Sequence, residues 1–318
     1  MGGAGMGWIE ITLICFASLL VLFTVSVSYF IARGVFHPLH LSLAQTRAKE
    51  MERTPDLLLE YDRWEKHPYM IRSRFGYDLK TYFLPADETG TAGTKKNKFV
   101  VIAHGYTYSH HGSIKYAWLM KKFGFNVILY DERYHGESGG KTCTLGYYEQ
   151  FDLEDVISDT FLRYGPNLFL GTYGESMGAT TALLEQGFDH RLRFVIADCG
   201  FADLPLLLTN MVKSRYHLPW FPFIPLAEMF FRMATRTSIK KIRPIAAVPK
   251  ATQPILFIHG QEDRFVPAIH SQMLYDACPT AKQIYLAENN ARHAESFRKN
   301  RQEYERILTE FMVQNQLF

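Results

Sequence analysis

Six short, continuous apolar runs, each long enough for one buried strand, most constrain how this chain can fold. In chain order they are KFVVIAHG, FNVILYDE, NLFLGTYG, RFVIADCG, PILFIHG and QIYLAE. Runs that are apolar at every position, rather than at alternate ones, are typical of strands buried on both faces of a parallel sheet. A loop or a helical pattern follows each of the first five runs, so the chain is expected to form a doubly wound α/β sheet.

Helical spacing of apolar residues predicts helices over about 113–123, 148–164, 176–186 and 267–277, and a hairpin that turns near Phe75 precedes the first run. One stretch of about 50 residues, between ADCGFADL and PILFIHG, is far longer than a crossover helix needs. We expect it to form a helical cap over the carboxyl ends of the strands, at about 204–248. The alternative is a structural excursion with no part in any site.

The N-terminal segment is the least like a soluble protein, because residues 11–32 contain no charge. At about 1.5 Å per residue, a helix of that length covers the hydrocarbon core of a bilayer, which is about 30 Å thick. We expect a single transmembrane anchor within residues 1–38, a connecting segment at 39–64 and the main domain at 65–318. A cleaved signal peptide, with a small-x-small site at 26–28, and a buried core helix are the alternatives.

The charges around this segment bear on its orientation. Four basic residues lie between positions 33 and 53, whereas only the chain amine precedes the apolar run. The positive-inside rule therefore favours a cytoplasmic main domain at a cell membrane. The acidic Glu50 and Glu52 lie among the basic residues, so the side of the membrane stays open.

Charge and cysteine content exclude several other classes. The 35 basic and 32 acidic residues are spread along the chain and leave a net charge of +3, so no basic block points to nucleic acid. Cys15 lies in the apolar run, and the other three cysteines contain no C-x-x-C pair, so neither a disulfide framework nor a zinc site is indicated. His110, His111 and His259 lack partners at metal-ligand spacing. We expect no metal and no cofactor.

The pentapeptide GESMG, residues 174–178, follows one apolar run directly and precedes a helical pattern. It fits the pattern G-x-S-x-G, in which a serine on a sharp turn between a strand and a helix acts as a nucleophile. Ser176 is therefore the candidate nucleophile, and a purely structural glycine turn is the alternative reading. A serine hydroxyl needs a base to take its proton, and that base needs an acid to orient it.

Later strands supply both partners. Asp263 follows the run PILFIHG, and His293 lies in the loop after QIYLAE, in the chain order serine, aspartate, histidine. Asp198, at the end of another run, is the second candidate for the acid. An oxyanion also needs two backbone N–H donors, for which Met177 and Tyr106 are the candidates.

The segments HGY, YDERYHGESGG, GESMG, HGQEDRFVP and ARH, in this order, resemble the α/β-hydrolase superfamily, and within it the membrane-anchored serine esterases and lipases of bacteria. The resemblance extends from about Glu65 to Phe318. It implies an α/β-hydrolase fold, a Ser176–Asp263–His293 triad and oxyanion donors at Tyr106 and Met177. One departure is Tyr134, which stands where such proteins commonly carry glycine in D-x-R-G-H-G.

The expected activity is hydrolysis of a carboxylic ester, on a small-molecule or lipid-like acyl substrate, without a cofactor. A peptidase, a thioesterase or an acyltransferase would use the same three residues, and a binding protein on a hydrolase fold is a further alternative. The aromatic segment HLPWFPFIPLAEMFF lies within the expected cap. We expect Trp220 and Phe221 to contact a hydrophobic acyl group, because buried methylenes contribute about 0.8 kcal/mol each. The sequence leaves the oligomeric state open.

Overall fold

The computed structural model describes residues 7–86 and 97–317. An eight-stranded sheet forms its centre, in the order β1-β2-β4-β3-β5-β6-β7-β8. Its strands are β1 (His67–Arg72), β2 (Asp78–Leu84), β3 (Lys98–Ala103), β4 (Asn126–Tyr130), β5 (Phe169–Glu175), β6 (Val195–Asp198), β7 (Ile255–Gly260) and β8 (Lys282–Ala287). β2 pairs antiparallel with both β1 and β4, and every other neighbouring pair is parallel. The predicted mostly parallel α/β sheet is confirmed.

The helices that were expected from periodicity are present as α4, α5, α6 and α10, with ends that differ from the expected ones by at most two residues. The full set is α1 (Trp8–Phe36), α2 (Leu43–Arg53), α3 (Pro55–Arg63), α4 (Ile114–Lys122), α5 (Glu149–Tyr164), α6 (Met177–Glu185), α7 (Leu204–Tyr216), α8 (Phe223–Thr235), α9 (Pro244–Ala247), α10 (Ile269–Ala277), α11 (Ser296–Lys299) and α12 (Arg301–Gln314). Short 3-10 turns lie at His110–Ser113, Ile239–Lys241 and Val248–Lys250.

Side chains on the central strands alternate between two hydrophobic clusters, one on each face of the sheet. In β3, Val100 and Ile102 belong to the cluster that α3, α4 and α12 cover. Phe99 and Val101 belong to the cluster that α5, α6 and α10 cover. Both faces of these strands are therefore buried, which explains why apolar residues occupy consecutive positions rather than alternate ones.

The segment at 39–64 was expected only to connect an anchor to the main domain. In the structure it forms α2 and α3, which break at Pro55. Leu57, Leu58 and Tyr61 of α3 are buried in the cluster shared with α4 and α12. This segment is thus part of the hydrophobic core as well as a connection.

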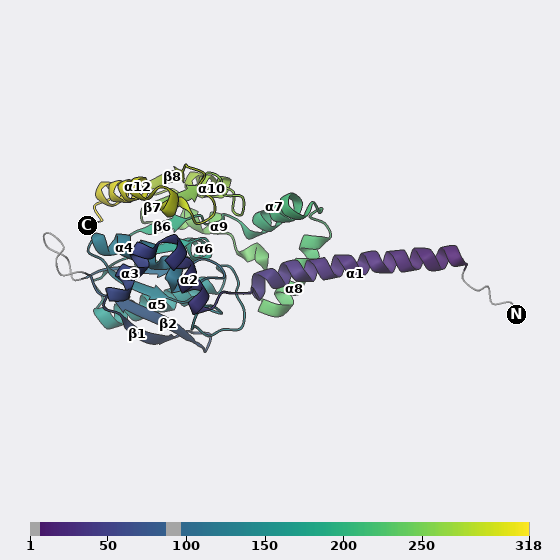
Figure 1. Ribbon diagram of the computed structural model, residues 1–318, viewed down its shortest axis with the longest axis horizontal. Helices are drawn as coiled ribbons and strands as arrows, with labels where there is room; N and C mark the ends of the chain where they lie inside the picture. Colours follow the sequence, from purple (N-terminus) through teal and green to yellow (C-terminus); the bar gives the residue numbers. More distant parts are fainter. Residues whose placement is uncertain (1–6, 87–96, 318) are drawn as a thin grey trace.

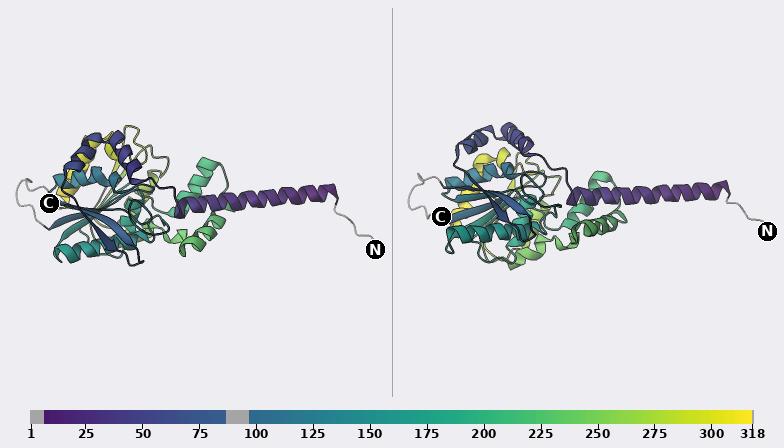
Figure 2. Two further views of the ribbon diagram at one scale, coloured as in Figure 1. Left: turned by 60° about the horizontal axis from the view of Figure 1, so that its bottom comes forward. Right: turned by 90° about the horizontal axis from the view of Figure 1, so that it is seen from below.

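Helix α1 projects away from the rest of the molecule as a single long rod (Figures 1 and 2). It contains an 18-residue window with mean hydropathy 2.4, of which only 6% is buried. Its length and composition are sufficient to cross a membrane, and a buried core helix would not leave such a surface uncovered. Its last turns enter the protein, where Ala32, Val35 and Phe36 are buried.

Helices α7 and α8 occupy most of the expected cap and flank the base of α1 (Figures 1 and 2). A third hydrophobic cluster joins the end of α1 to residues of α7 and α8, including Leu204 and Phe231. Further out, the ring of Phe23 in α1 lies 6.3 Å from that of Phe223 in α8. The rings of Tyr29 and Phe230 lie 5.4 Å apart. The cap therefore packs around the apolar helix, which was not expected from the sequence.

Candidate active site

Ser176 lies between the end of β5 and the start of α6, with φ 55° and ψ −111°. A positive φ is strained for serine, and such a sharp turn exposes a side chain at the carboxyl edge of a sheet. The flanking glycines make this turn possible. A Cβ on Gly174 would lie 2.2 Å from the carbonyl carbon of Gly178, and one on Gly178 would lie 2.1 Å from the carbonyl oxygen of Ala103. Neither position can therefore hold a larger residue without moving the backbone.

The three residues expected to act together form one series of hydrogen bonds. The Ser176 Oγ lies 2.8 Å from Nε2 of His293. The other ring nitrogen of His293, Nδ1, lies 2.6 Å from Oδ2 of Asp263. Nδ1–H therefore donates to the carboxylate, and Nε2 accepts from the serine hydroxyl. This is the arrangement in which a histidine can take the proton of a serine that attacks a carbonyl.

Asp263 is held in place by further donors. Its Oδ1 accepts the backbone N–H groups of Phe265 at 2.8 Å and Val266 at 2.9 Å. Its Oδ2 lies 3.2 Å from Nε2 of His259. Burial would raise the pKa of Asp263, but hydrogen bonds with His259 and His293 outweigh burial and hold this pKa well below its usual range. The carboxylate is therefore charged at neutral pH.

His259 is the contributor to this site that sequence reasoning missed. It is fully buried at the end of β7, and its Nδ1 accepts the Ser271 hydroxyl at 2.7 Å. Its Nε2–H faces both the carbonyl oxygen of Val266, at 2.7 Å, and Asp263. The available signal was its position four residues before Asp263, on the strand that carries the acid.

The expected oxyanion donors lie beside the serine. Met177 is the first residue of α6, so its N–H has no partner within the helix. Tyr106 follows Gly105, whose hypothetical Cβ would lie 3.7 Å from Cβ of Ser176. Within residues 7–86 and 97–317, neither backbone N–H takes part in a hydrogen bond of a loop or turn. Tyr106, Ser176 and Met177 line the same cavity.

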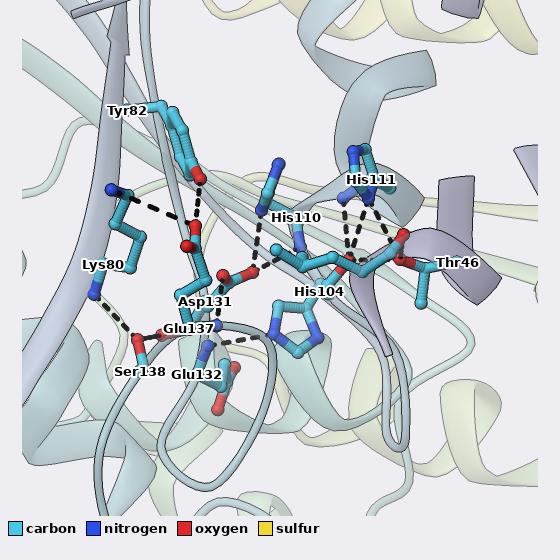
Figure 3. Close-up of polar contacts among 12 residues, drawn as sticks. Thr46, Lys80, Tyr82, His104, His110, His111, Asp131, Glu132, Glu137 and Ser138 are labelled. Carbon is cyan, nitrogen blue, oxygen red and sulfur yellow. Dashed lines mark hydrogen bonds and ion pairs between the residues drawn. The ribbon is translucent and has the colours of Figure 1, made fainter. Parts of the chain in front are cut away.

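Buried polar contacts fix the loop that carries Tyr106 (Figure 3). His104 accepts the backbone N–H of Glu132 on its Nε2, at 2.9 Å. Next to it, Oδ1 of Asp131 accepts the backbone N–H of His110 at 2.8 Å and lies 2.9 Å from Nδ1 of the same histidine. Burial opposes this charge, but the hydrogen bond with His110 lowers the pKa of Asp131 to about 2. His104 thus braces the loop.

Tyr134, which departs from the resemblance, keeps the left-handed backbone that glycine would favour, with φ 65°. Its hydroxyl lies 3.0 Å from the ring nitrogens of His37, at the end of α1. Its ring also packs against His40, with centroids 5.0 Å apart. The loop therefore retains its turn, and the added side chain contacts the segment that leaves α1.

Asp198, the second candidate for the acid, belongs to a separate buried cluster. Its Oδ2 accepts the hydroxyls of Tyr116 at 3.0 Å and Tyr304 at 2.9 Å. Burial and the nearby carboxylate of Glu175 raise the pKa of Asp198 to about 6. Among the described residues it has no hydrogen bond with His293, so the structure brings Asp263 to the histidine rather than Asp198.

Two cavities meet at the catalytic candidates. The first has a volume of about 250 Å³ and extends from Ser176 between α1 and α7. The second is more polar and is lined by His293 and by several basic side chains. Trp220 and Phe221, in the loop between α7 and α8, line neither cavity and are 57% and 63% exposed. The residues assigned from composition to acyl contact are therefore not the ones beside Ser176.

Among residues 7–86 and 97–317, no group of three or more His, Cys, Asp or Glu side chains is arranged to hold a metal ion. The cysteines in this part of the chain are free.

Comparisons with known proteins point to hydrolases. The family described as serine aminopeptidase, S33 matches residues 94–191, and the prolyl oligopeptidase family matches residues 164–316. The uncharacterized protein YqkD of Bacillus subtilis is 35% identical over 266 residues, which cover 83% of this chain and 85% of YqkD. The thiohydrolase aneE of Aspergillus aculeatus is 26% identical over 207 residues, which cover 60% of this chain and 58% of that protein.

Solved structures show the same fold. The Pyrococcus furiosus esterase Pf2001 superposes with a TM-score of 0.63 at 22% identity, over 80% of this chain and 93% of the esterase. An acylaminoacyl peptidase of Pyrococcus horikoshii superposes with a TM-score of 0.58 at 16% identity, over 80% of this chain and 43% of the peptidase. Given the extent of the match to YqkD, both hydrolase families and this fold, the chain belongs to the α/β-hydrolase superfamily, as a member of the serine-hydrolase type.

Proposed function

We propose that this chain is a serine hydrolase that cleaves carboxylic esters through an acyl intermediate on Ser176. The observation that carries the proposal is the hydrogen-bonded series from Ser176 through His293 to Asp263, at the inner end of an apolar cavity. Each residue type suits one role, since serine is the nucleophile, histidine the base and aspartate the group that orients the base.

The reaction has two steps. In the first, Ser176 Oγ bonds to the ester carbonyl carbon while Nε2 of His293 takes its proton, and the carbonyl oxygen becomes an oxyanion held by the N–H groups of Tyr106 and Met177. The carbon–oxygen bond to the alcohol then breaks, and His293 gives its proton to the leaving oxygen. In the second step, water repeats the attack, releases the carboxylic acid and restores the serine.

The first cavity supports a preference for hydrophobic acyl groups. Almost all of its lining is aliphatic or aromatic, and none of its lining residues is an aspartate or glutamate. An aminopeptidase has to bind the protonated amine of its substrate, for which a buried carboxylate is the usual partner. This cavity therefore suits an acyl chain better than an amino terminus.

The competing activities are tested together with the ester activity. In detergent, the full chain is expected to react covalently with a fluorophosphonate probe and to hydrolyse p-nitrophenyl esters. Its kcat/KM should rise severalfold with each added methylene from acetyl to octanoyl, because each buried methylene contributes about 0.8 kcal/mol. Steady-state rates on the esters, on an aminoacyl p-nitroanilide and on an acyl-CoA provide the comparison. Faster turnover of the anilide or the acyl-CoA would make the protein a peptidase or a thioesterase instead.

We also propose that α1 is a permanent membrane anchor and, from the charge bias, that the hydrolase domain is cytoplasmic. Support comes from a contact that α1 makes before the possible cleavage site, because the ring of Phe23 lies 6.3 Å from that of Phe223 in the cap. Cleavage near residues 26–28 would remove Phe23 and leave Phe223 without this partner. A signal peptide has no reason to pack against the domain that it leaves.

The anchor gives a simple fractionation result. The full chain, expressed in bacteria, is expected to stay with the membranes after an alkaline carbonate wash, and intact-mass measurement should find its N-terminal residues still present. Detergent should release it, because the exposed apolar surface of α1 needs a substitute for lipid. Recovery in the soluble fraction, or a mature protein that begins near residue 28, would support the signal-peptide alternative instead.

A further inference from the structure

We infer that the substrate is a long-chain acyl ester drawn from the bilayer, and that its leaving alcohol carries a phosphate or a similar anion. The inference rests on the proposed ester hydrolysis at Ser176 and names the substrate class of that site. Two features carry it: the membrane helix is a wall of the apolar cavity, and His293 lines a second, basic cavity.

Helix α1 forms one side of the apolar cavity and α7 forms the other. The α7 side chains that face it recur at helical spacing over the whole length of that helix, so the cavity follows the helix from Ser176 outward. Those of α1 are Phe30, Ile31, Gly34 and Val35. Phe30 and Ile31 belong to the uncharged run at 11–32, so the cavity lining continues into the surface that lipid would cover.

The cap reaches the depth at which acyl chains lie. Phe23, which packs on Phe223 of the cap, is nine residues before Ala32. At about 1.5 Å per residue, Phe23 therefore lies about 14 Å along the helix from Ala32, the last residue of the uncharged run. The neighbouring loop exposes Trp220 and Phe221, and at this depth lipid would cover their apolar rings. These two residues therefore contact lipid rather than the bound acyl group.

A contact between α1 and the loop that carries Tyr106 also connects the membrane helix to the active site. The Tyr106 hydroxyl donates a hydrogen bond to the carbonyl oxygen of Gly34 in α1. The backbone N–H of Tyr106 is one of the two proposed oxyanion donors. Helix α1 thus positions the oxyanion loop as well as the acyl cavity, so the site is complete only while the anchor is in place.

The leaving group departs on the side of His293, because this residue gives it a proton. The second cavity lies on that side and contains five basic side chains and two acidic ones. They are Arg215, Arg264, Arg292, Arg298 and Lys299, with Glu262 and Glu295. Arg298 pairs with Glu295, whereas within residues 7–86 and 97–317 the other four cations have no ion pair. The leaving-group side therefore has an excess of positive charge.

Arg215 connects the two halves of the site. It lies in the last turn of α7 and lines both cavities, as Phe265 does. A guanidinium at the boundary between an apolar channel and a basic cavity fits a molecule with an acyl chain at one end and an anion at the other. Arginine binds phosphate oxygens through two parallel hydrogen bonds, and a phosphate ester with a charge of about −2 matches an excess of cations better than a single carboxylate does.

The test compares two substrates that differ only in the anion. The full chain is reconstituted in nanodiscs of ether-linked phosphatidylcholine, which contains no ester to hydrolyse. Either 1-palmitoylglycerol or 1-palmitoylglycerol 3-phosphate is added to the bilayer, and palmitoyl-CoA is supplied in water as a third arm. Mass spectrometry measures the initial rate of palmitate release. We expect the phosphate-bearing glycerol ester to be hydrolysed about tenfold faster than the neutral one, since a charge-assisted contact has about that effect.

Two variants with matched controls test which residues set the preference for the anion and for the long acyl chain. The double change Arg215→Gln and Lys299→Gln should bring the ratio of these two rates close to one. The control is Arg193→Gln with Lys250→Gln, two exposed cations outside both cavities, which should keep the ratio near ten.

Met211→Trp should narrow the apolar cavity and lower the rate on palmitoyl relative to butyryl esters about tenfold. Its neighbour Asn210 is exposed and outside the channel, so Asn210→Trp should leave that ratio as it was.

The outcomes separate this inference from the proposed function. Equal rates for the two glycerol esters, with p-nitrophenyl butyrate still hydrolysed, would overturn the anionic leaving group alone. Hydrolysis of palmitoyl-CoA tenfold faster than either bilayer ester would overturn the membrane source. Absence of both covalent labelling and butyrate hydrolysis would instead refute the ester hydrolase itself.

Discussion

Replacing Ser176 with alanine is expected to lower kcat for ester hydrolysis by on the order of 10⁶-fold and to abolish labelling by a fluorophosphonate probe. No other group in the apolar cavity lies within hydrogen-bond distance of Nε2 of His293 among the described residues. The remaining rate would come from the oxyanion donors and from substrate binding, which the change leaves in place. Alanine keeps the Cβ and the strained backbone of position 176, so the fold should be retained.

The measurement uses p-nitrophenyl butyrate and the same probe on both proteins, with a thermal unfolding curve to show that both are folded. Ser158→Ala is a suitable control, because Ser158 lies on α5 and contacts only Arg191 among hydrogen-bonded side chains of the described residues. Its activity and labelling should match those of the unaltered chain. Labelling that persists in Ser176→Ala would place the nucleophile elsewhere.

The strands were predictable because their signal is local. Each of β3 to β7 is buried on both faces, so its own sequence is mostly apolar and the strand can be recognised without knowledge of its neighbours. Ser176 was predictable for a similar reason. The glycines on either side of it lie too close to the backbone of the same turn and of β3 to be replaced by a larger residue. The turn therefore requires a pentapeptide that can be recognised in the sequence.

The walls of the cavity could not be predicted in this way. Hydropathy marks residues 11–32 as a membrane segment, but it does not tell which helix packs against the end of that segment. A domain boundary at residue 38 therefore divides the chain between Gly34 and Tyr106, although the structure joins these two residues by a hydrogen bond. Composition alone also cannot tell that Trp220 and Phe221 point outward, since that depends on the direction of the loop between α7 and α8.

The choice between two candidate acids illustrates the same limit. Asp198 and Asp263 both follow parallel strands at the carboxyl edge of the sheet, so the sequence placed both near Ser176. Only the path of the loop after β8 decides which of them meets His293. The structure gives Asp198 two tyrosine hydroxyls as partners, and gives Asp263 the histidine.

That distinction makes Asp263→Asn the second change with a large expected effect. We expect kcat to fall by about 10⁴-fold, with little change in the folded structure. An asparagine amide can present its NH₂ group to Nδ1 of His293, which favours the tautomer with the proton on Nε2. In that tautomer the histidine cannot accept the proton of Ser176. The loss of negative charge also removes the partner of the imidazolium that forms during the reaction. Steady-state rates on p-nitrophenyl butyrate between pH 6 and 9 measure the effect.

The matched control is Asp198→Asn, which removes the same charge from a neighbouring strand. Because Asp198 contacts Tyr116 and Tyr304 rather than His293, this change should alter thermal stability but keep kcat within about tenfold of the unaltered chain. A large loss of kcat at every pH between 6 and 9 should therefore occur in Asp263→Asn and not in Asp198→Asn. The pKa of Asp263 lies well below its usual range, so protonation of this residue cannot explain any fall in rate between pH 6 and 9. A severe loss in Asp198→Asn, with a mild one in Asp263→Asn, would show that the buried tyrosine cluster holds the catalytic acid.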